Sequence, residues 1–212
     1  MRQIFDRAAL LFFSSFTRMK GYRFSKVETN NQHADADKIY NEGGFKFPDI
    51  LQKEVDFYKK NTLRFIAYYN NMPVGTVSLA NPRIVNRPYE LHGIDENATH
   101  YEIQSLLVSK DHRECSQMVF LGLIKEIYLY SVENGISSWI SSGMRNMYLT
   151  LRRYNKNIKC IKINKDNCKR PLASYLYDHK IVDTCSIMNV EDFKPTKILI
   201  KFLKKQLKKR IK

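Results

Sequence analysis

Two carboxylates stand where a protein could use them for chemistry. Glu102 opens a strand-like segment, and Asp56 follows a short helical pattern. A carboxylate in such a place can accept a proton from a reacting group or bind a cationic amine. Each also has an ordinary explanation, since Glu102 could be a solvated residue at a strand end and Asp56 a surface acid.

The cysteines argue against a metal site. Cys115, Cys160, Cys168 and Cys185 form no C-x-x-C pair, the spacing that is typical of zinc sites. We interpret Cys115, in a helix-start pattern, and Cys160, in a strand pattern, as small core residues or free thiols. Free thiols fit a reducing compartment, so a cytoplasmic location is expected.

Hydrophobic spacing predicts helices and a hairpin in the first half of the chain. An amphipathic helix is expected over residues 2–19, ending at Gly21, and a hairpin is expected around Asn70-Asn71. The other elements expected here are a strand over Tyr22–Glu28, helices over Asp35–Asn41 and Pro48–Val55, hairpin strands over Thr62–Tyr69 and Pro73–Leu79, and a loop over 80–98.

Strands and helices alternate in the second half. Its strongest pattern is a long apolar helix over Ser116–Asn134, which Gly135 ends. A hairpin half followed by a β-α-β half predicts an α+β fold, an α/β/α sandwich with a mixed, mostly antiparallel central sheet and helices on both faces. The remaining expected elements are strands over Thr99–Val108, Ile136–Ser141, Ile158–Ile163 and Ile181–Val190, and helices over Met144–Tyr154 and Pro171–Asp178.

The charge is concentrated at one end of the chain. There are 36 Lys and Arg residues against 21 Asp and Glu, a net charge of +15, and Lys194–Lys212 holds nine basic residues and no acid. We expect one domain over residues 1–193, beginning with the amphipathic helix over 1–20, and a basic amphipathic helix over 194–212. Such a chain attracts an acidic partner: nucleic acid, anionic lipid, a CoA phosphate or an acidic carrier protein.

Three stretches resemble the motifs of a known family. The stretches are Ile39–Phe45 with Glu54–Tyr58, Phe65–Ala67 with Val74–Leu79, and Tyr101–Val108 with Arg113. They are similar, in that order, to Y/F-x-E-x-G-F with E-x-D-x-F/Y-D, to V-G-T-x-R-L, and to E-x-S-R-L/F-x-V followed by R. The resemblance runs from about Val27 to Ile163 and points to the GNAT acyltransferase fold, in the branch of the autoinducer (acyl-homoserine lactone) synthases and N-acyl amino acid synthases.

The chain departs from that family at several positions. Lys59 replaces the second acid after Asp56, Ser78 and Ser105 replace two arginines, and no arginine stands directly before Ile39. The family's arginines help to organise its acidic site. Their loss argues against homoserine lactone chemistry and favours a changed substrate or a degenerate site.

The resemblance implies roles for particular residues. It implies that Glu102 is the base, acting directly or through a water, and that Asp56 binds the acceptor amine. Backbone groups of Leu107 and Val108 would hold the acyl carbonyl and the pantetheine amide, although both residues are also ordinary strand core. The acyl chain is expected along Trp139, Met144 and Tyr148, for which plain core packing is the commoner explanation.

The turn after the third stretch bears on the acyl donor. Acetyltransferases of this fold hold the CoA pyrophosphate on a glycine-rich turn at a helix N-terminus, and Arg113–Met118, which includes Ser116, has no glycine. Acyl carrier protein is therefore favoured over acyl-CoA as the co-substrate, and no tightly bound cofactor is expected. The residues expected to dock the acidic carrier, unless they are simply solvated, are Arg113, Arg145, Arg152, Arg153 and Lys156.

The basic tail has apolar residues at helical spacing with lysines around them. This pattern predicts a helix that lies on an anionic membrane surface, and a nucleic-acid arm or a solvated tail are the alternatives. No stretch of about 18 apolar residues occurs, so no membrane-spanning helix is expected. The residues expected at the membrane are Lys201, Phe202, Lys204, Lys205 and Lys208.

Two functions follow from the sequence. The first is an N-acyltransferase that moves a fatty acyl group from acyl carrier protein or acyl-CoA to an amine, expected to be an amino acid or a related small amine. The alternative is a catalytically degenerate protein of the same fold that binds lipid, a membrane or a partner. Nucleic-acid binding has only the net charge in its favour, because no helix-turn-helix, zinc or RNP pattern occurs.

Overall fold

A seven-stranded sheet forms the centre of the molecule. The computed structural model describes residues 2–43, 46–84, 99–143, 145–152, 157–168, 171–194, 197–198 and 200–202. Within them the strand order is β1-β2-β3-β4-β5-β7-β6. The strands are β1 (Tyr22–Lys26), β2 (Thr62–Tyr69), β3 (Met72–Ala80), β4 (Tyr101–Val108), β5 (Ser138–Gly143), β6 (Lys159–Lys162) and β7 (Thr184–Asn189).

The sheet is mixed, and one pair of strands is parallel. β4 and β5 run parallel, while the other neighbouring strands pair antiparallel. Parallel neighbours need a crossover, and the long helix α5 (Ser116–Glu133) supplies it between β4 and β5. The predicted order of a hairpin half followed by a β-α-β half is confirmed.

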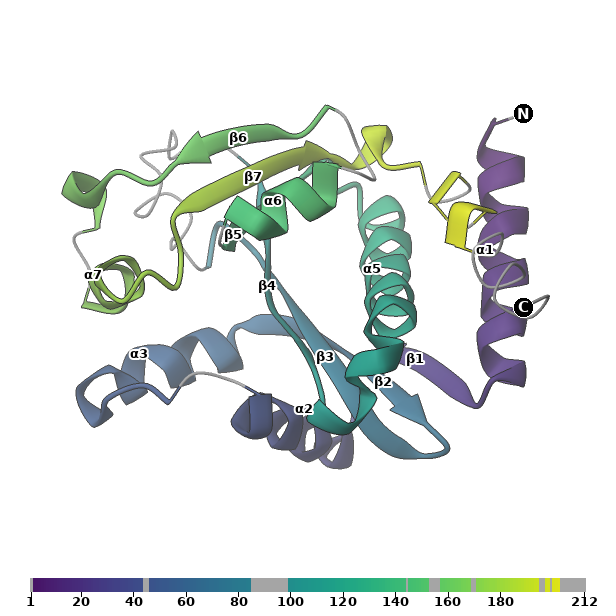
Figure 1. Cartoon of the computed structure of the whole chain (residues 1–212), viewed down its shortest axis with the longest axis horizontal. Coiled ribbons are helices and arrows are strands. Elements are labelled where there is room, and N and C mark those ends of the chain that lie inside the picture. The colour runs from purple at the N-terminus through teal and green to yellow at the C-terminus, as the bar shows by residue number, and fades with distance from the viewer. Residues whose placement is uncertain are drawn as a thin grey trace.

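Helices cover both faces of the sheet (Figure 1). α1 (Arg2–Met19), α5 and α6 (Arg145–Arg152) lie on one face, and α2 (Asn30–Gly43), α3 (Asp49–Lys60) and α7 (Pro171–Asp178) lie on the other. The alternation along β2 explains this, because Phe65 and Ala67 join the core under α5 while Ile66 and Tyr68 pack with Ala36 of α2. The predicted sandwich is confirmed.

The hairpin between β2 and β3 is fixed by its turn residues. Tyr69 pairs with Met72, so the loop contains only Asn70 and Asn71, with φ values of 47° and 66°. Two central residues with positive φ make a type I′ turn, whose twist matches that of the strands it joins. Asparagine tolerates this conformation better than most residues, which is why the sequence predicted the hairpin correctly.

The helix α2 begins earlier than the sequence predicted. It starts at Asn30 rather than Asp35, because Thr29 and Gln32 form a capping box. The Gln32 N–H donates to Thr29 Oγ1, and Gln32 Oε1 accepts from the Thr29 N–H at 3.1 Å. The pair provides hydrogen-bond acceptors for N–H groups that have none at the start of a helix. A polar segment with little apolar periodicity therefore still folds as a helix.

The cysteine interpretation needs one correction. Cys115 and Cys160 are exposed, so the idea that they are small core residues is wrong, while Cys185 is the buried one. All four thiols are free. Cys160 lies on the short strand β6 at the edge of the sheet, where one face is open to solvent.

Gly75 lets α5 lie close to the sheet. A Cβ at Gly75 would sit 2.5 Å from Cγ1 of Val119 on α5 and 3.1 Å from the carbonyl oxygen of Leu107. We expect Gly75→Ala to lower the free energy of unfolding by about 1–3 kcal/mol, because either the helix or β4 must shift. Urea denaturation measures this change.

The matched control is Gly43→Ala at the end of α2, where the nearest atom to an added Cβ is 3.9 Å away. It should leave the urea midpoint unchanged or raise it slightly, because alanine favours helix. Equal midpoints for the two variants would contradict the close packing at Gly75.

Candidate functional site

Strands β4 and β5 separate after a short paired start. Among the described residues they pair only at Tyr101 with Trp139 and at Glu102 with Ile140. β4 remains paired with β3 as far as Val108, while β5 pairs with β7 along its length. A wedge-shaped gap therefore opens between the two parallel strands beyond Glu102, and the β5-facing edge of β4 can offer its backbone groups to a ligand there.

A bulge in β4 lies directly beside this gap. Gln104 pairs with Ser78 and Leu107 with Thr76, so Ser105 and Leu106 face a single residue of β3. Ser105 has φ of 54°, a left-handed conformation that costs a non-glycine residue about 1 kcal/mol or more. Bulges bend a strand and redirect its side chains, and they recur next to active sites.

The bulge sorts the side chains of β4 onto the two faces. Residues three apart on a regular strand point to opposite faces, yet Ile103 and Leu106 both line the cavity under α5. Gln104 and Ser105 are adjacent, yet both line the pocket on the opposite face. The extra residue therefore gives each face two neighbouring contacts from one strand.

Glu102 lies at the vertex of the gap and is buried. Its side chain is 1% exposed, and Ser142 Oγ of β5 donates to its Oε1 at 3.3 Å. Its cross-strand partner Ala80 belongs to the apolar cluster of α3 and α7, so the carboxylate faces that side of the sheet. The simpler explanation, a solvated residue at a strand end, is therefore wrong.

Two further titratable groups lie near this carboxylate. Burial, with added repulsion from Glu102 and Cys160, raises the pKa of the Cys185 thiol, which therefore stays protonated at neutral pH. Burial and the nearby Lys159 lower the pKa of His100, whose Nδ1 is 2.6 Å from Ser138 Oγ. His100 is thus a neutral hydrogen-bonding group two residues before Glu102, and no sequence pattern indicated it.

A polar pocket lies on the face of the sheet that carries α2, α3 and α7. It encloses about 410 Å³ of empty space, open solvent at its mouth included. Gln104 lies two residues beyond Glu102 on the same face of β4, so the carboxylate is next to this pocket. The pocket is lined by Tyr40, Phe47, Val55, Tyr58, Lys59, Thr62, Arg64, Ser78, Gln104, Ser105 and Leu172.

The polar pocket holds two cationic side chains. The Arg64 side chain is 6% exposed, and its Nη1 lies 2.8 Å from Oδ1 of Asp37 on α2. Lys59 is half-buried, with Nζ 4.2 Å from the ring centre of Tyr40. Sequence reasoning missed Arg64, although a lone cation within the apolar strand Thr62–Tyr69 was a signal that could have found it.

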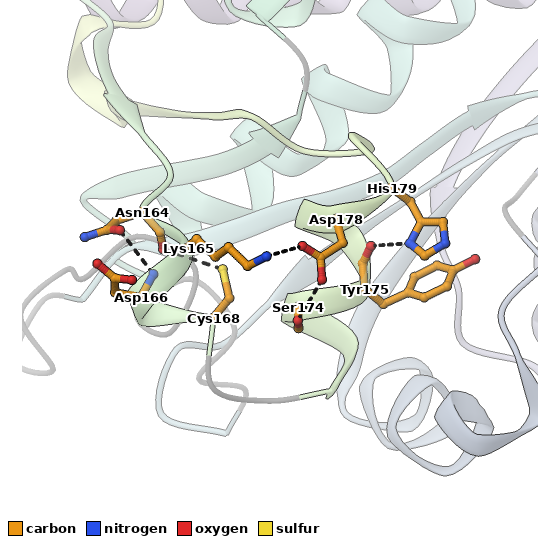
Figure 2. Close-up of polar contacts among 8 residues, drawn as sticks. All are labelled: Asn164, Lys165, Asp166, Cys168, Ser174, Tyr175, Asp178 and His179. Atoms are coloured by element: carbon orange, nitrogen blue, oxygen red, sulfur yellow. Dashed lines mark hydrogen bonds and ion pairs between the residues drawn. The ribbon is translucent and has the colours of Figure 1, made fainter.

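Contacts with α3 and with the preceding 3₁₀ turn hold α7 at the wall of this pocket. Glu54 Oε2 of α3 accepts from the Leu172 N–H at 3.1 Å in the first turn of α7, where a negative charge is favourable. At the other end Lys165 Nζ lies 2.9 Å from Asp178, which also accepts from Ser174 (Figure 2). The ion pair is exposed and contributes little, so the contacts of Glu54 matter more.

An apolar cavity lies on the other face, under α5. It encloses about 620 Å³ of empty space, open solvent at its mouth included. Its walls come from both strands of the gap and from the helices that cover them. The lining residues are Ile103, Leu106, Phe120, Leu121, Ile124, Trp139, Ile140, Ser141, Leu151, Ile158, Ser186, Met188, Phe193 and Ile198.

The expected acyl-chain residues lie in different places. Trp139 lines the cavity, is 1% exposed and donates from Nε1 to Ser131 Oγ at 2.9 Å. Tyr148 is half-buried against the same apolar core. Met144 lies outside the described residues. Trp139 is therefore both a cavity wall and a hydrogen-bonded core residue.

Asp56 does not face the pocket. The inward face of α3 carries Leu51, Val55 and Tyr58, and Asp56 is exposed on the outer side, where Gln52 donates to its carboxylate at 2.7 Å. The structure therefore does not bring Asp56 into the polar pocket, and binding of the acceptor amine by Asp56 stays a prediction. Of the two acids in that motif it is Glu54 that points inward, and its contact is with the start of α7.

The expected donor-binding residues follow the ends of the separated strands. Leu107 and Val108 close β4 and pair with Thr76 and Gly75. Arg113 is exposed in the 3₁₀ helix over Lys110–Cys115, and Ser116 begins α5. These positions border the gap, and binding of a donor there stays a prediction.

The expected docking and membrane residues are only partly described. Arg145 and Arg152 are exposed on α6, and Lys201 is exposed. Phe202, expected at a membrane, is 2% exposed and packs edge-on against Phe13 of α1 with ring centres 6.1 Å apart, so that expectation is wrong. Five expected residues lie outside the described residues: Arg153, Lys156, Lys204, Lys205 and Lys208.

Solved structures share this arrangement of strands and helices. The chain aligns with FeeM, an N-acyl amino acid synthase from uncultured soil microbes, with a TM-score of 0.63 and 12% identity over 85% of this chain and 96% of that one. It aligns with a GNAT-family acetyltransferase from Staphylococcus aureus with a TM-score of 0.50 and 14% identity, over 80% and 99%. The chain has the GNAT fold.

A GNAT-family protein from Desulfovibrio desulfuricans gives a similar result, with a TM-score of 0.50, 13% identity and coverage of 80% and 99%. By sequence no family model matches the chain, and no curated protein matches it. At these identities the likeness is one of fold, so activity has to be argued from the side chains.

Two other kinds of site are not found in the described part of the chain. Its His, Cys, Asp and Glu side chains form no group of three or more that could hold a metal ion. None of its helices is both long and apolar enough to cross a membrane.

Proposed function

We propose that the protein is an N-acyltransferase that moves a fatty acyl group from an acyl carrier protein, or from acyl-CoA, to the amine of an amino acid or a related small amine. The observation that carries this proposal is the position of Glu102. It is a buried carboxylate at the vertex of the gap between β4 and β5, with a cationic polar pocket on one face of the sheet and an apolar cavity on the other.

The arrangement supplies what acyl transfer to an amine needs. Glu102 takes a proton from the acceptor, directly or through a water, and the amine nitrogen attacks the thioester carbonyl carbon. Backbone N–H groups on the free edge of β4 hold the oxyanion that forms. The C–S bond then breaks, so the products are an amide and a free thiol, to which the proton returns.

The apolar cavity suits a fatty acyl chain. Its walls are mainly aliphatic and aromatic side chains, which is the lining that an alkyl chain requires. Ile103 and Leu106 of β4 form part of the wall, so an alkyl chain in the cavity continues from a thioester held in the gap.

The polar pocket suits an acceptor that carries an anion. Arg64 lies directly opposite Ser78, the position at which the resembling family has an arginine. Lys59 stands where that family has an acid, so the two substitutions give the pocket a second cation. A carboxylate of the acceptor can pair with these cations while its amine faces Glu102, and charge-assisted hydrogen bonds of this kind are strong.

The mouth of the gap suits an acidic carrier protein. Because β4 and β5 are parallel, their C-terminal ends open at the same edge, with exposed Lys110 and Arg113 after β4 and exposed Arg145 and Arg152 after β5. The Ser116 N–H at the start of α5 already donates to the Arg113 carbonyl, so one of the groups that a CoA pyrophosphate would use is occupied. Both features favour carrier protein as the donor.

Glu102→Gln tests the base. We expect the rate of amide formation to fall about 100-fold or more, because the amide cannot accept the proton. Mass spectrometry of products from acyl carrier protein and from acyl-CoA donors measures it. Asp56→Asn is the matched control, since it makes the same change on the outer side of α3 and should keep the wild-type rate. An unchanged rate in Glu102→Gln would contradict the role of Glu102 as the base, whereas a wild-type protein that forms no amide from either donor would support the alternative of a binding protein without activity.

Lys59→Gln and Arg64→Gln test the acceptor class. The wild-type protein should prefer an amino acid over its carboxamide, and removal of either cation should reduce that preference about tenfold or more in kcat/KM. Lys53→Gln, on the exposed side of α3, should leave the preference unchanged. Thermal unfolding checks that each variant is folded, because Arg64 also pairs with Asp37. A preference that survives both substitutions would contradict the cationic acceptor pocket.

A further inference from the structure

The helix α1 has two apolar faces, and only one of them is used inside the molecule. Leu10, Phe13 and Thr17 are buried, and Ser14 on the same side accepts a hydrogen bond from Lys125 of α5 at 2.8 Å. A surface helix of a globular protein normally carries polar residues on the side that faces away from the core.

The outward side of α1 is apolar as well. Leu11 is 64% exposed, Phe12 59% and Met19 78%. At about 100° per residue these three side chains lie on one stripe with the exposed Ala8 and Ser15, so the stripe runs along most of the helix. Large exposed apolar side chains gathered on one surface mark a binding site rather than ordinary surface.

The C-terminal segment lies beside α1 (Figure 1). Residues 197–198 and 200–202 are helical and lie beside α1 (Figure 1), where Phe202 packs on Phe13. Ile198 points inward and lines the apolar cavity, whereas Ile200 is 47% exposed. Two segments far apart in the sequence therefore lie side by side (Figure 1), and each carries exposed apolar side chains.

Exposed basic residues lie on both segments. Arg18 and Lys20 are exposed at the end of α1, and Lys197 and Lys201 are exposed on the C-terminal segment. The sequence has no Asp or Glu between Arg7 and Val27, and none after Asp192. An apolar stripe accompanied by exposed basic residues is complementary to a layer of acyl chains beneath anionic head groups.

We propose that the outward face of α1, defined by Leu11, Phe12 and Met19, binds the surface of an anionic phospholipid bilayer together with Ile200, Lys197 and Lys201. The apolar side chains enter the layer below the head groups, and the lysines and arginines pair with the lipid phosphates. None of these six residues lines either pocket, so the proposal does not depend on the enzymatic one.

Flotation with lipid vesicles tests the proposal. The full chain should float with vesicles of phosphatidylglycerol and phosphatidylcholine and stay in the dense fraction with phosphatidylcholine alone. The double variant Leu11→Ser with Phe12→Ser should bind the anionic vesicles at least about tenfold more weakly. Both side chains are mostly exposed, so the variant should fold, and its thermal unfolding should match the wild type.

Matched variants separate the apolar and the charged parts. Ile50→Ser on α3 removes an apolar side chain that is 88% exposed, and it should bind the vesicles as the wild type does. Lys197→Gln with Lys201→Gln should weaken vesicle binding and reduce its dependence on salt. Lys53→Gln with Lys60→Gln on α3 should have a smaller effect on both the affinity and its salt dependence.

Four results would overturn the proposal. The first is a wild-type chain that does not float with anionic vesicles, and the second is equal flotation of the Leu11, Phe12 double variant. The third is that, in sedimentation without lipid, the wild type is a dimer and the double variant is a monomer. This result would assign the surface to a second copy of the chain. Binding of acyl carrier protein that the double variant abolishes, with flotation unchanged, would assign it to the carrier.

Discussion

The left-handed residue Ser105 is the point on which the candidate site depends. A regular β4 would alternate its side chains between the two faces, and it could follow β5 further along the sheet. The extra residue at Ser105 bends the strand, turns Leu106 toward the cavity under α5 and leaves Gln104 beside the polar pocket. Its conformational cost of about 1 kcal/mol or more is offset by the continuous pairing with β3 on either side. Glu102, three residues earlier, is thereby the last paired residue before the gap.

The parts of the fold that depend on local signals could be predicted from the sequence. The hairpin follows from Asn70-Asn71, and α5 follows from an apolar run with Gly135 after it. The bulge could not be predicted, because it depends on the register between Gln104 and Ser78, which only the assembled sheet defines. The place of Arg64 in the polar pocket could not be predicted for the same reason, since its sequence neighbours are apolar and its partners come from α2 and β3.

A residue suggested by a motif can reach the site only if it lies on the inward face of its helix. Glu54 and Asp56 are two positions apart, so they lie on different sides of α3, and only Glu54 points toward the sheet. Phe202 shows the same difficulty in the tail, where apolar spacing was interpreted as a membrane face and proves to be the face that packs on α1. The exposed apolar residues of these two segments are Ile200 in the tail and Leu11, Phe12 and Met19 on α1. Hydrophobic periodicity therefore located both helices but could not say which apolar face is buried.

The central claim is that Glu102 sits where a thioester in the gap meets an acceptor from the polar pocket. A crystal structure of the protein with a non-hydrolysable S-alkyl pantetheine thioether tests it most directly. The account predicts the sulfur atom between β4 and β5 beside Glu102, with the alkyl chain against Ile103 and Leu106. A ligand bound elsewhere, with the gap filled by protein side chains, would contradict the account.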